Sequence, residues 1–340
     1  MEASAQAFAE LQKPFQIFLQ SAKNLEGLHY LKDDPNLTKL EIGAGEFTDI
    51  SELRDFKNLT SLAISQVPLN STGIVDATVL ETLPNLDNLV LSNSRVRDVD
   101  FLRKLTKLKT LWLTSTVASD FSPLAPLSSL EKLDIRGAPG SDLAPLSGLH
   151  KLQELGIGGN QAAGLSNLSG LPELQTLMII DQKPFPLNAV PTLKNLKSLS
   201  IWGPPQIDLS PLRQATQLED LAVSGLGFGA LTAVADPAAI GGLTGLKSLT
   251  LGQLLMTDLN FIHGLTRLQT VVVNTLPVTS IGFLSDLRSL EKVTLVDVQV
   301  VDVSPLLSVP ALREVTMVRV PARSDVLLQL QRQGVQVTTY

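Results

Sequence analysis

The sequence predicts an α/β solenoid, in which short strands form one parallel sheet on the concave face and irregular turns form the convex face. Three observations predict this fold class. The fragment L-x-x-L-x-L recurs thirteen times, ten of the twelve intervals between its copies are 22 residues long, and 44% of the 340 residues are hydrophobic. A fixed period of this length indicates repeats that stack on one another and share a continuous core.

The first part of each repeat predicts a strand. With the first leucine of the fragment as position 1, apolar residues occupy positions 1, 4 and 6. Alternation with a period of two is typical of a strand with one buried face, so positions 3, 5 and 7 are expected on the concave surface. The repeats start at Leu37, Leu59, Leu86, Leu108, Leu130, Leu152, Leu174, Leu196, Leu218, Leu246, Leu268, Leu290 and Leu312.

The second part of each repeat predicts a 3₁₀ or irregular segment on the convex face. Apolar residues usually fall at positions 14, 17 and 20, as at Leu143, Leu146 and Leu149. Spacing by three suits a 3₁₀ turn. Prolines also gather in this part, as in SPLAPL at 122–127, where no strand ladder needs their missing N–H.

This pattern resembles the leucine-rich repeat family, in particular its 22-residue subclass, which includes the internalins and a regulatory subunit of protein phosphatase 1. The resemblance covers residues 37–320. The family usually has Asn at position 9, whereas here Asn160 is the single Asn among thirteen residues at that position. We therefore expect no asparagine ladder, and we expect the C-terminal repeats to bury apolar residues such as Leu254 there instead.

Three regions are predicted, because a solenoid must cover the core that its end repeats expose. They are an N-terminal cap at 1–36, thirteen repeats at 37–320, and a C-terminal cap at 321–340.

Each cap has its own predicted elements. The N-terminal cap is expected to contain a helix over 3–12 and a degenerate repeat, with Phe15 at position 1 and Phe18 at position 4. The C-terminal cap is expected to contain a helix with Ser324 as its N-cap and Gly334 as its stop, followed by a strand.

Two repeats are longer than the others, with 27 and 28 residues, and the extra residues lie near 66–84 and 226–243. Each insertion has room for a short helix. In the second insertion, Pro237 would begin or break that helix. Such an insertion is either a tolerated surface loop or a loop that reaches a partner.

Composition and spacing argue against several classes of function. A formal net charge of −6 argues against a nucleic-acid-binding protein. The chain has no cysteine, and His29, His150 and His263 lie in different repeats without metal-ligand spacing. We therefore expect no metal site, no cofactor and no enzymatic activity.

The expected location is the cytoplasm, because the first residues lack the pattern of a secretory signal and cysteine is absent. No run of 18 uncharged apolar residues occurs, so no membrane span is expected. We expect the isolated chain to be a monomer.

The concave face is the candidate binding surface. Trp112 and Trp202 are the two tryptophans of the chain, and both are predicted to lie on this face rather than in the core. Tryptophan, methionine and arginine are enriched where interfaces gain most of their binding energy. The alternative is that each indole packs on its own sheet. The candidate ligand-binding residues are Val90, Trp112, Asp134, Arg136, Glu154, Met178, Ile180, Trp202 and Asp220.

The function that this sequence favours is non-catalytic recognition of a protein partner on the concave face. The family resemblance implies a ligand-sensing domain, such as that of an NLR-like immune receptor or another multidomain protein. Two alternatives stay open. One is a regulatory subunit that docks on an enzyme such as a phosphatase, and the other is an exported adhesin that binds host protein or glycan. Fold alone does not decide among them.

Overall fold

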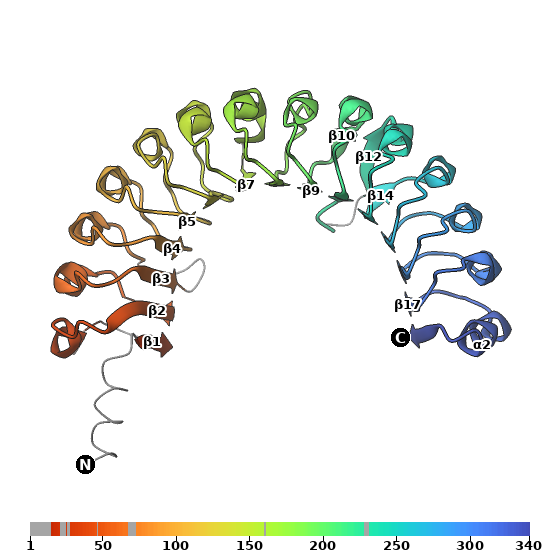
Figure 1. Cartoon of the computed structure of the whole chain (residues 1–340), viewed down its shortest axis with the longest axis horizontal. Coiled ribbons are helices and arrows are strands. Elements are labelled where there is room, and N and C mark those ends of the chain that lie inside the picture. Colours follow the sequence, from red (N-terminus) through yellow and green to blue (C-terminus); the bar gives the residue numbers. More distant parts are fainter. Residues whose placement is uncertain are drawn as a thin grey trace, which may run out of the picture. The chain divides into compact units, whose positions relative to one another are not determined.

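The computed structural model describes residues 15–20, 25, 28–45, 47–66, 73–159, 161–227 and 231–340. The chain divides into two compact units, Met1–Leu174 (unit 1) and Gln175–Tyr340 (unit 2). Within each unit, strands line the inner, concave side and 3₁₀ segments line the outer, convex side (Figure 1). This is the predicted leucine-rich repeat solenoid, with one strand and one outer segment in a typical repeat.

The sheet of unit 1 has its strands in sequence order, and the described pairs are all parallel. Residues 22 apart in the chain become neighbours, as where Leu111 pairs with Leu133. The strands of unit 1 are β1 (Phe15–Gln20), β2 (Leu37–Gly45), β3 (Ser61–Gln66), β4 (Asn88–Ser92), β5 (Thr110–Trp112), β6 (Lys132–Asp134) and β7 (Glu154–Gly158).

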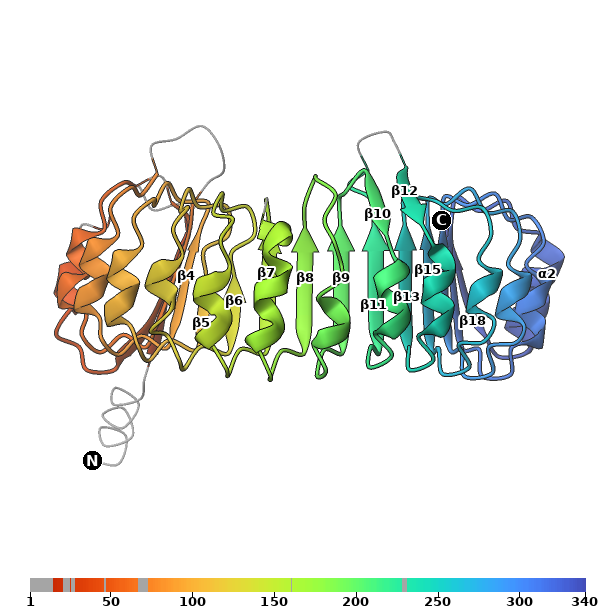
Figure 2. The same cartoon turned by 90° about the horizontal axis from the view of Figure 1, so that it is seen from above.

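The main sheet of unit 2 is parallel as well, in the order β8-β9-β11-β13-β15-β16-β17-β18. In Figure 2, outer segments of this unit lie in front of its strands β9 and β11. The strands are β8 (Thr176–Ile180), β9 (Ser198–Trp202), β11 (Asp220–Ser224), β13 (Ser248–Gly252), β15 (Thr270–Asn274), β16 (Lys292–Val296), β17 (Glu314–Val318) and β18 (Gln336–Thr339).

The outer segments are 3₁₀ turns, as the spacing of three predicts. Their leucines are buried, and Leu102, Leu105 and Leu108 are all inaccessible to solvent. The segments are η1 (Leu28–Leu31), η2 (Ser51–Asp55), η3 (Thr78–Thr82), η4 (Asp100–Lys104), η5 (Ser122–Leu124), η6 (Ala144–Gly148), η7 (Gln161–Gly170), η8 (Val190–Thr192), η9 (Ser210–Gln214), η10 (Pro237–Gly242), η11 (Asn260–Ile262), η12 (Gly282–Leu284) and η13 (Ser304–Ser308).

A second, smaller sheet lies in unit 2, and the sequence analysis did not predict it. It consists of β10 (Gln206–Asp208), β12 (Thr232–Ala235) and β14 (Leu254–Leu255), in that order. The insertion predicted near 226–243 supplies β12, and Pro237 then begins η10 at the position that a proline tolerates best. Part of this insertion, and part of the one near 66–84, lies outside the described residues.

The ends of the chain correct two details of the sequence analysis. Phe18 was predicted at buried position 4, but it is 52% exposed and pairs with Glu41 at position 5. An irregularity between Phe15 and Gln16 shifts the register by one residue, which exchanges the two faces of β1. At the other end, α2 (Ser324–Arg332) includes Ser324 as its first residue instead of its N-cap. The helix predicted over 3–12 lies outside the described residues.

Aspartates cap the first turn of many outer segments. Eight of them stand two residues before an outer segment, and each carboxylate accepts the first N–H of that segment at 2.8–2.9 Å. This satisfies amides that a short 3₁₀ turn would otherwise leave unpaired. The aspartate ladder comprises Asp49, Asp76, Asp98, Asp120, Asp142, Asp208, Asp258 and Asp302.

The aspartate ladder makes stability depend on acid pH. Hydrogen bonds from Ser51, Thr78, Ser122 and Ser304 lower the pKa of Asp49, Asp76, Asp120 and Asp302 below the ordinary value of 3.8. A carboxyl whose pKa is lower in the folded state stabilises the fold above the unfolded pKa, and this contribution disappears as the pH falls through the folded value.

We therefore expect the urea midpoint of unfolding to fall as the pH drops below about 4, and to fall less in a variant with all four changed to Asn. Asparagine can still accept the amide but does not titrate. Equal acid sensitivity of the variant and the wild type, measured by circular dichroism, would show that other carboxyls control it.

Position 9 itself is filled by several residue types. Leu254, Leu276 and Val298 are buried there, as expected for the C-terminal repeats, whereas Gln182 is exposed. In unit 1, Ser94 is 3% exposed, and its Oγ is a buried atom without a hydrogen-bond partner among the described residues.

We expect Ser94→Ala to leave the free energy of unfolding unchanged or to raise it by up to about 1 kcal/mol, because it removes a buried polar group that gains no bond. Thr116→Val is the matched change one repeat later. The Thr116 Oγ1 donates to the Leu113 carbonyl at 3.0 Å, so this change should cost about 0.5–1.5 kcal/mol. Urea denaturation compares the two, and the reverse order would contradict the assignment.

Candidate binding surface

The candidate surface is the open face of the sheet, which we define in each unit as the strand residues at positions 3, 5 and 7. Burial alternates along the strands, as in β4, where Leu89 and Leu91 are fully buried and the residues beside them are half-buried. The strand ladder therefore aligns side chains from successive repeats into rows. The two units are described separately, because five of the nine candidate residues lie in unit 1 and four in unit 2.

In unit 1, Trp112 occupies the centre of one row. It pairs in register with Val90 on β4 and with Asp134 on β6. The indole is 45% exposed, although the core of this unit accepts side chains as large as Phe101 and Phe121. Trp112 is therefore on the open face, as predicted, and it offers a large apolar surface to a partner.

An ion pair borders Trp112. The Arg136 Nε donates to Asp134 Oδ1 at 2.9 Å, and Nη2 donates to Oδ2 at 2.5 Å. These bonds raise the pKa of the Arg136 guanidinium, while its burial opposes the shift. The Asp134 side chain is 12% exposed and that of Arg136 is 31% exposed, so the pair is rigid and largely desolvated.

Gly156 on β7 leaves room for this ion pair. It is the register partner of Asp134, and a Cβ at residue 156 would lie 2.8 Å from Asp134 Oδ1. Glu154, the fifth candidate of unit 1, forms a 2.6 Å ion pair with Lys132 at an exposed position, where such pairs contribute little.

In unit 2, three of the four candidates form one apolar cluster. Ile180 on β8 pairs in register with Trp202 on β9, and Met178 lies two residues before Ile180 on the same face. Trp202 is 36% exposed, and Met178 and Ile180 are half-buried. On the next strand the row continues with the small residue Ser224.

Asp220 does not belong to this cluster. It pairs with Ser198 at position 3, at the opposite end of the strand from Trp202. Burial, and then the neighbouring charge of Glu219, raise the pKa of Asp220. Hydrogen bonds from Lys247 and Lys197 lower the pKa of Glu219 to about 2. Glu219 forms ion pairs with both lysines, so the charges at this end of the strand form a network that does not include the apolar cluster.

The sequence analysis missed two features that are relevant to binding. The aspartate ladder could have been found, because Asp98, Asp120 and Asp142 follow one another at intervals of 22. The small sheet β10-β12-β14 has no comparable signal. Within the described parts of the chain, no group of three His, Cys, Asp or Glu side chains is placed to hold a metal ion. The helices described are all too short or too polar to cross a bilayer.

Comparisons with known proteins agree with the repeat geometry. A family model described as "Leucine Rich repeats (2 copies)" matches residues 84–126. A search of curated proteins finds no match.

Similar solved structures come from several organisms. An internalin of Listeria monocytogenes (inlF) is 26% identical with a TM-score of 0.67, and the match covers 90% of this chain and 88% of that one. A leucine-rich repeat protein of Leptospira interrogans is 17% identical with a TM-score of 0.68, covering 95% and 89%.

A further likeness is to the Toll–Spätzle complex of Drosophila, at 18% identity and a TM-score of 0.62, covering 97% of this chain and 46% of that one. At these identities the Leptospira and Toll structures inform the fold alone. Together with the 22-residue period, the parallel strands and the buried leucines described above, the comparisons identify this chain as a leucine-rich repeat protein with 22-residue repeats.

Proposed function

We propose that this chain is a non-catalytic recognition module that binds a protein partner on the open face of its sheet. Leucine-rich repeat folds serve as protein-recognition scaffolds, and similar solved structures include Toll with Spätzle and PEPR1 with AtPEP1. The observation that carries the proposal is the exposure of both tryptophans, 45% for Trp112 and 36% for Trp202, on the open faces of their units.

The finer proposal is a ligand-sensing domain of a cytoplasmic multidomain receptor. Its support is the composition of the open face, which combines indoles, Met178 and an Arg136–Asp134 pair with small polar residues. Mixed charges and aromatic anchors suit a folded protein surface, whereas a phosphate-rich partner would call for a basic stripe.

Site-specific photocrosslinking tests the proposal. A benzoylphenylalanine introduced at Val90 in unit 1, or at Ser200 in unit 2, points from the open face without replacing a tryptophan. In an extract of the source organism, we expect both positions to capture the same partner protein. The matched positions Lys104 and Gln214 are exposed on outer segments and should capture none of it.

The result separates the alternatives. Capture of an enzyme in a constant 1:1 ratio would favour a regulatory subunit over a sensor, and capture from host extract alone would favour an adhesin. Equal capture of one partner from the open face and from the outer segments would contradict recognition through the open face.

A further inference from the structure

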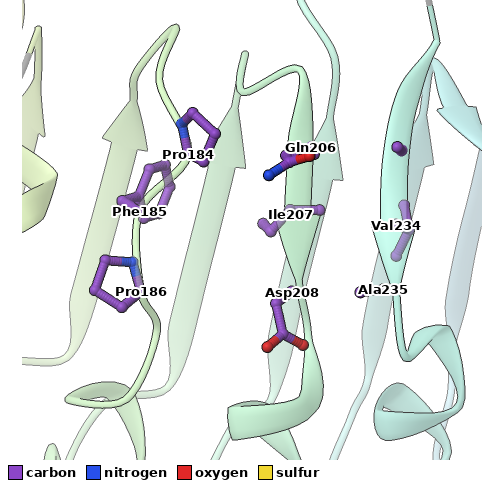
Figure 3. A pocket seen from close by; sticks show the side chains of 9 residues that line it. Pro184, Phe185, Pro186, Gln206, Ile207, Asp208, Val234 and Ala235 are labelled. Atoms are coloured by element: carbon purple, nitrogen blue, oxygen red, sulfur yellow. The ribbon is translucent and has the colours of Figure 1, made fainter.

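A cavity of about 520 Å³ lies over the small sheet of unit 2. Pro184, Phe185 and Pro186 form one side, and β10 and β12 form the rest (Figure 3). Its volume is within the range of about 300–1,000 Å³ that is common for ligand sites. None of its lining residues belongs to the open face, so an inference about this cavity does not depend on the proposed function. The lining residues are Pro184, Phe185, Pro186, Gln206, Ile207, Asp208, Ala233, Val234 and Ala235.

The lining is apolar except for two side chains, and the single charged side chain is negative. Seven of the nine residues are apolar, Gln206 is neutral, and Asp208 is the single charged residue among them. The Asp208 Oδ1 accepts the Ser210 N–H at 2.9 Å, as in the rest of the aspartate ladder, whereas Oδ2 has no hydrogen-bond partner among the residues that the structure describes. This carboxylate oxygen is therefore available to a cation.

The main chain of β10 adds further hydrogen-bond acceptors. The Ala233 N–H donates to the Pro205 carbonyl at 2.9 Å, and the Leu209 N–H donates to the Ala235 carbonyl at 3.0 Å. Successive residues of a strand direct their main-chain groups to opposite edges. The carbonyls of Gln206 and Asp208 therefore face the other edge, toward residues 184–186. Two of these three residues are prolines, which have no N–H to donate.

The cavity thus combines apolar walls, a carboxylate oxygen and main-chain carbonyls to which none of the described residues donates. We propose that it binds an arginine side chain of a partner polypeptide. The aliphatic stem lies along the prolines, and the guanidinium donates to Asp208 Oδ2 and to the outward carbonyls of β10. Arginine fits better than lysine, because its planar head carries five donors and is more weakly hydrated.

The surroundings of the cavity favour an arginine within a polypeptide over a free cation. Ala233 pairs in register with Leu255 on β14, and the Leu255 side chain is 59% exposed. Ala233 and Ala235 are exposed as well, so an apolar surface continues from the cavity across the small sheet. Apolar residues next to the arginine in an extended segment would cover this surface, and a free guanidinium compound would not.

Titration calorimetry with short peptides tests the assignment. The probe is acetyl-Ala-Val-Arg-Val-Ala-amide, and the matched probe carries citrulline, which has the same shape without the charge. We expect the arginine peptide to bind at least about tenfold more tightly, as a charge-assisted pair with a carboxylate implies. Amide shifts in an NMR titration should map to β10, β12 and the non-proline residues Lys183, Phe185 and Leu187.

Two variants locate the site. Asp208→Asn should weaken binding of the arginine peptide at least about fivefold, while its side-chain oxygen can still accept the Ser210 N–H and preserve the fold. Asp142→Asn changes the same position of the ladder in unit 1, which accepts the Ala144 N–H at 2.8 Å, and should leave binding unchanged. Ala235→Leu should fill the cavity and weaken binding of both probes.

Each possible outcome either supports or overturns the assignment of an arginine site. Equal binding by Asp208→Asn and the wild type, or amide shifts confined to the open face, would overturn the assignment. Binding of free arginine amide as tightly as the peptide would overturn the polypeptide part. Loss of binding in Asp142→Asn as well would show a general charge effect in place of a site.

Discussion

Replacing Leu155 with alanine is expected to lower the free energy of unfolding by about 2–5 kcal/mol. Leu155 is at position 4 of β7, is 2% exposed, and pairs in register with Leu133 of the preceding repeat. The change removes buried apolar volume that neighbouring repeats cannot refill, because their main chains are held by the strand ladder. Urea denaturation followed by circular dichroism measures the loss.

Val90→Ala is the matched control for Leu155→Ala. Val90 is an aliphatic strand residue of the same unit, but it is half-buried on the open face, so its truncation should cost well under 1 kcal/mol. A repeat protein can unfold in parts, so the transition should be followed both by circular dichroism and by tryptophan fluorescence, which reports Trp112 in unit 1 and Trp202 in unit 2. Equal losses for the two variants would mean that position 4 does not form the core.

The second large effect concerns binding. Trp112→Ala and Trp202→Ala should each weaken binding of the protein captured from the open face by about 1–3 kcal/mol, which is a factor of roughly 5 to 150 in the dissociation constant. Both indoles are more than a third exposed and lie outside the leucine core, so truncation should lower the free energy of unfolding without unfolding the repeats. Surface plasmon resonance measures the first quantity, and urea denaturation the second.

Val117→Ala and Val301→Ala are the controls for the tryptophan variants. Both valines are exposed apolar residues, at 38% and 52%, but neither lies in a strand or on the open face. They should leave affinity unchanged. Wild-type affinity in the Trp112→Ala/Trp202→Ala double variant would remove the open face from the proposed function.

The repeated part of the fold could be predicted because the 22-residue period brings equivalent positions of successive repeats into contact. A leucine at position 4, such as Leu133, meets the same position of the next repeat, Leu155, and the same holds for each pair along a unit. Alternation then decides which side chains face outward, so the exposure of Trp112 and Trp202 followed from spacing alone. The prediction was wrong at Phe18, where an irregularity in pairing shifted the register and the local pattern of apolar residues could not show it.

The sequence placed the candidate residues on the concave face, but it did not show which of them are neighbours. Sequence spacing assigned all nine to one surface, whereas the structure distributes them over two compact units and separates Asp220 from the cluster of Met178, Ile180 and Trp202. The Arg136–Asp134 pair also depends on Gly156, whose missing side chain opens the space for it. Gly156 beside Asp134, and Ile180 beside Trp202, are neighbours across different strands, and a periodic pattern does not describe the side-chain conformations that such contacts require.

The sequence by itself determined the repeat, the direction of each strand and the side chains that are buried, because a 22-residue period of leucines can bury its apolar residues only by stacking. Only the tertiary structure shows that β10, β12 and β14 pair with one another and that their pairing leaves a cavity. The β12 strand comes from an insertion that breaks the period, and its pairing with β10 depends on main-chain groups, which every residue type carries alike. The cavity beside Asp208 is a consequence of that pairing and of the prolines at 184 and 186.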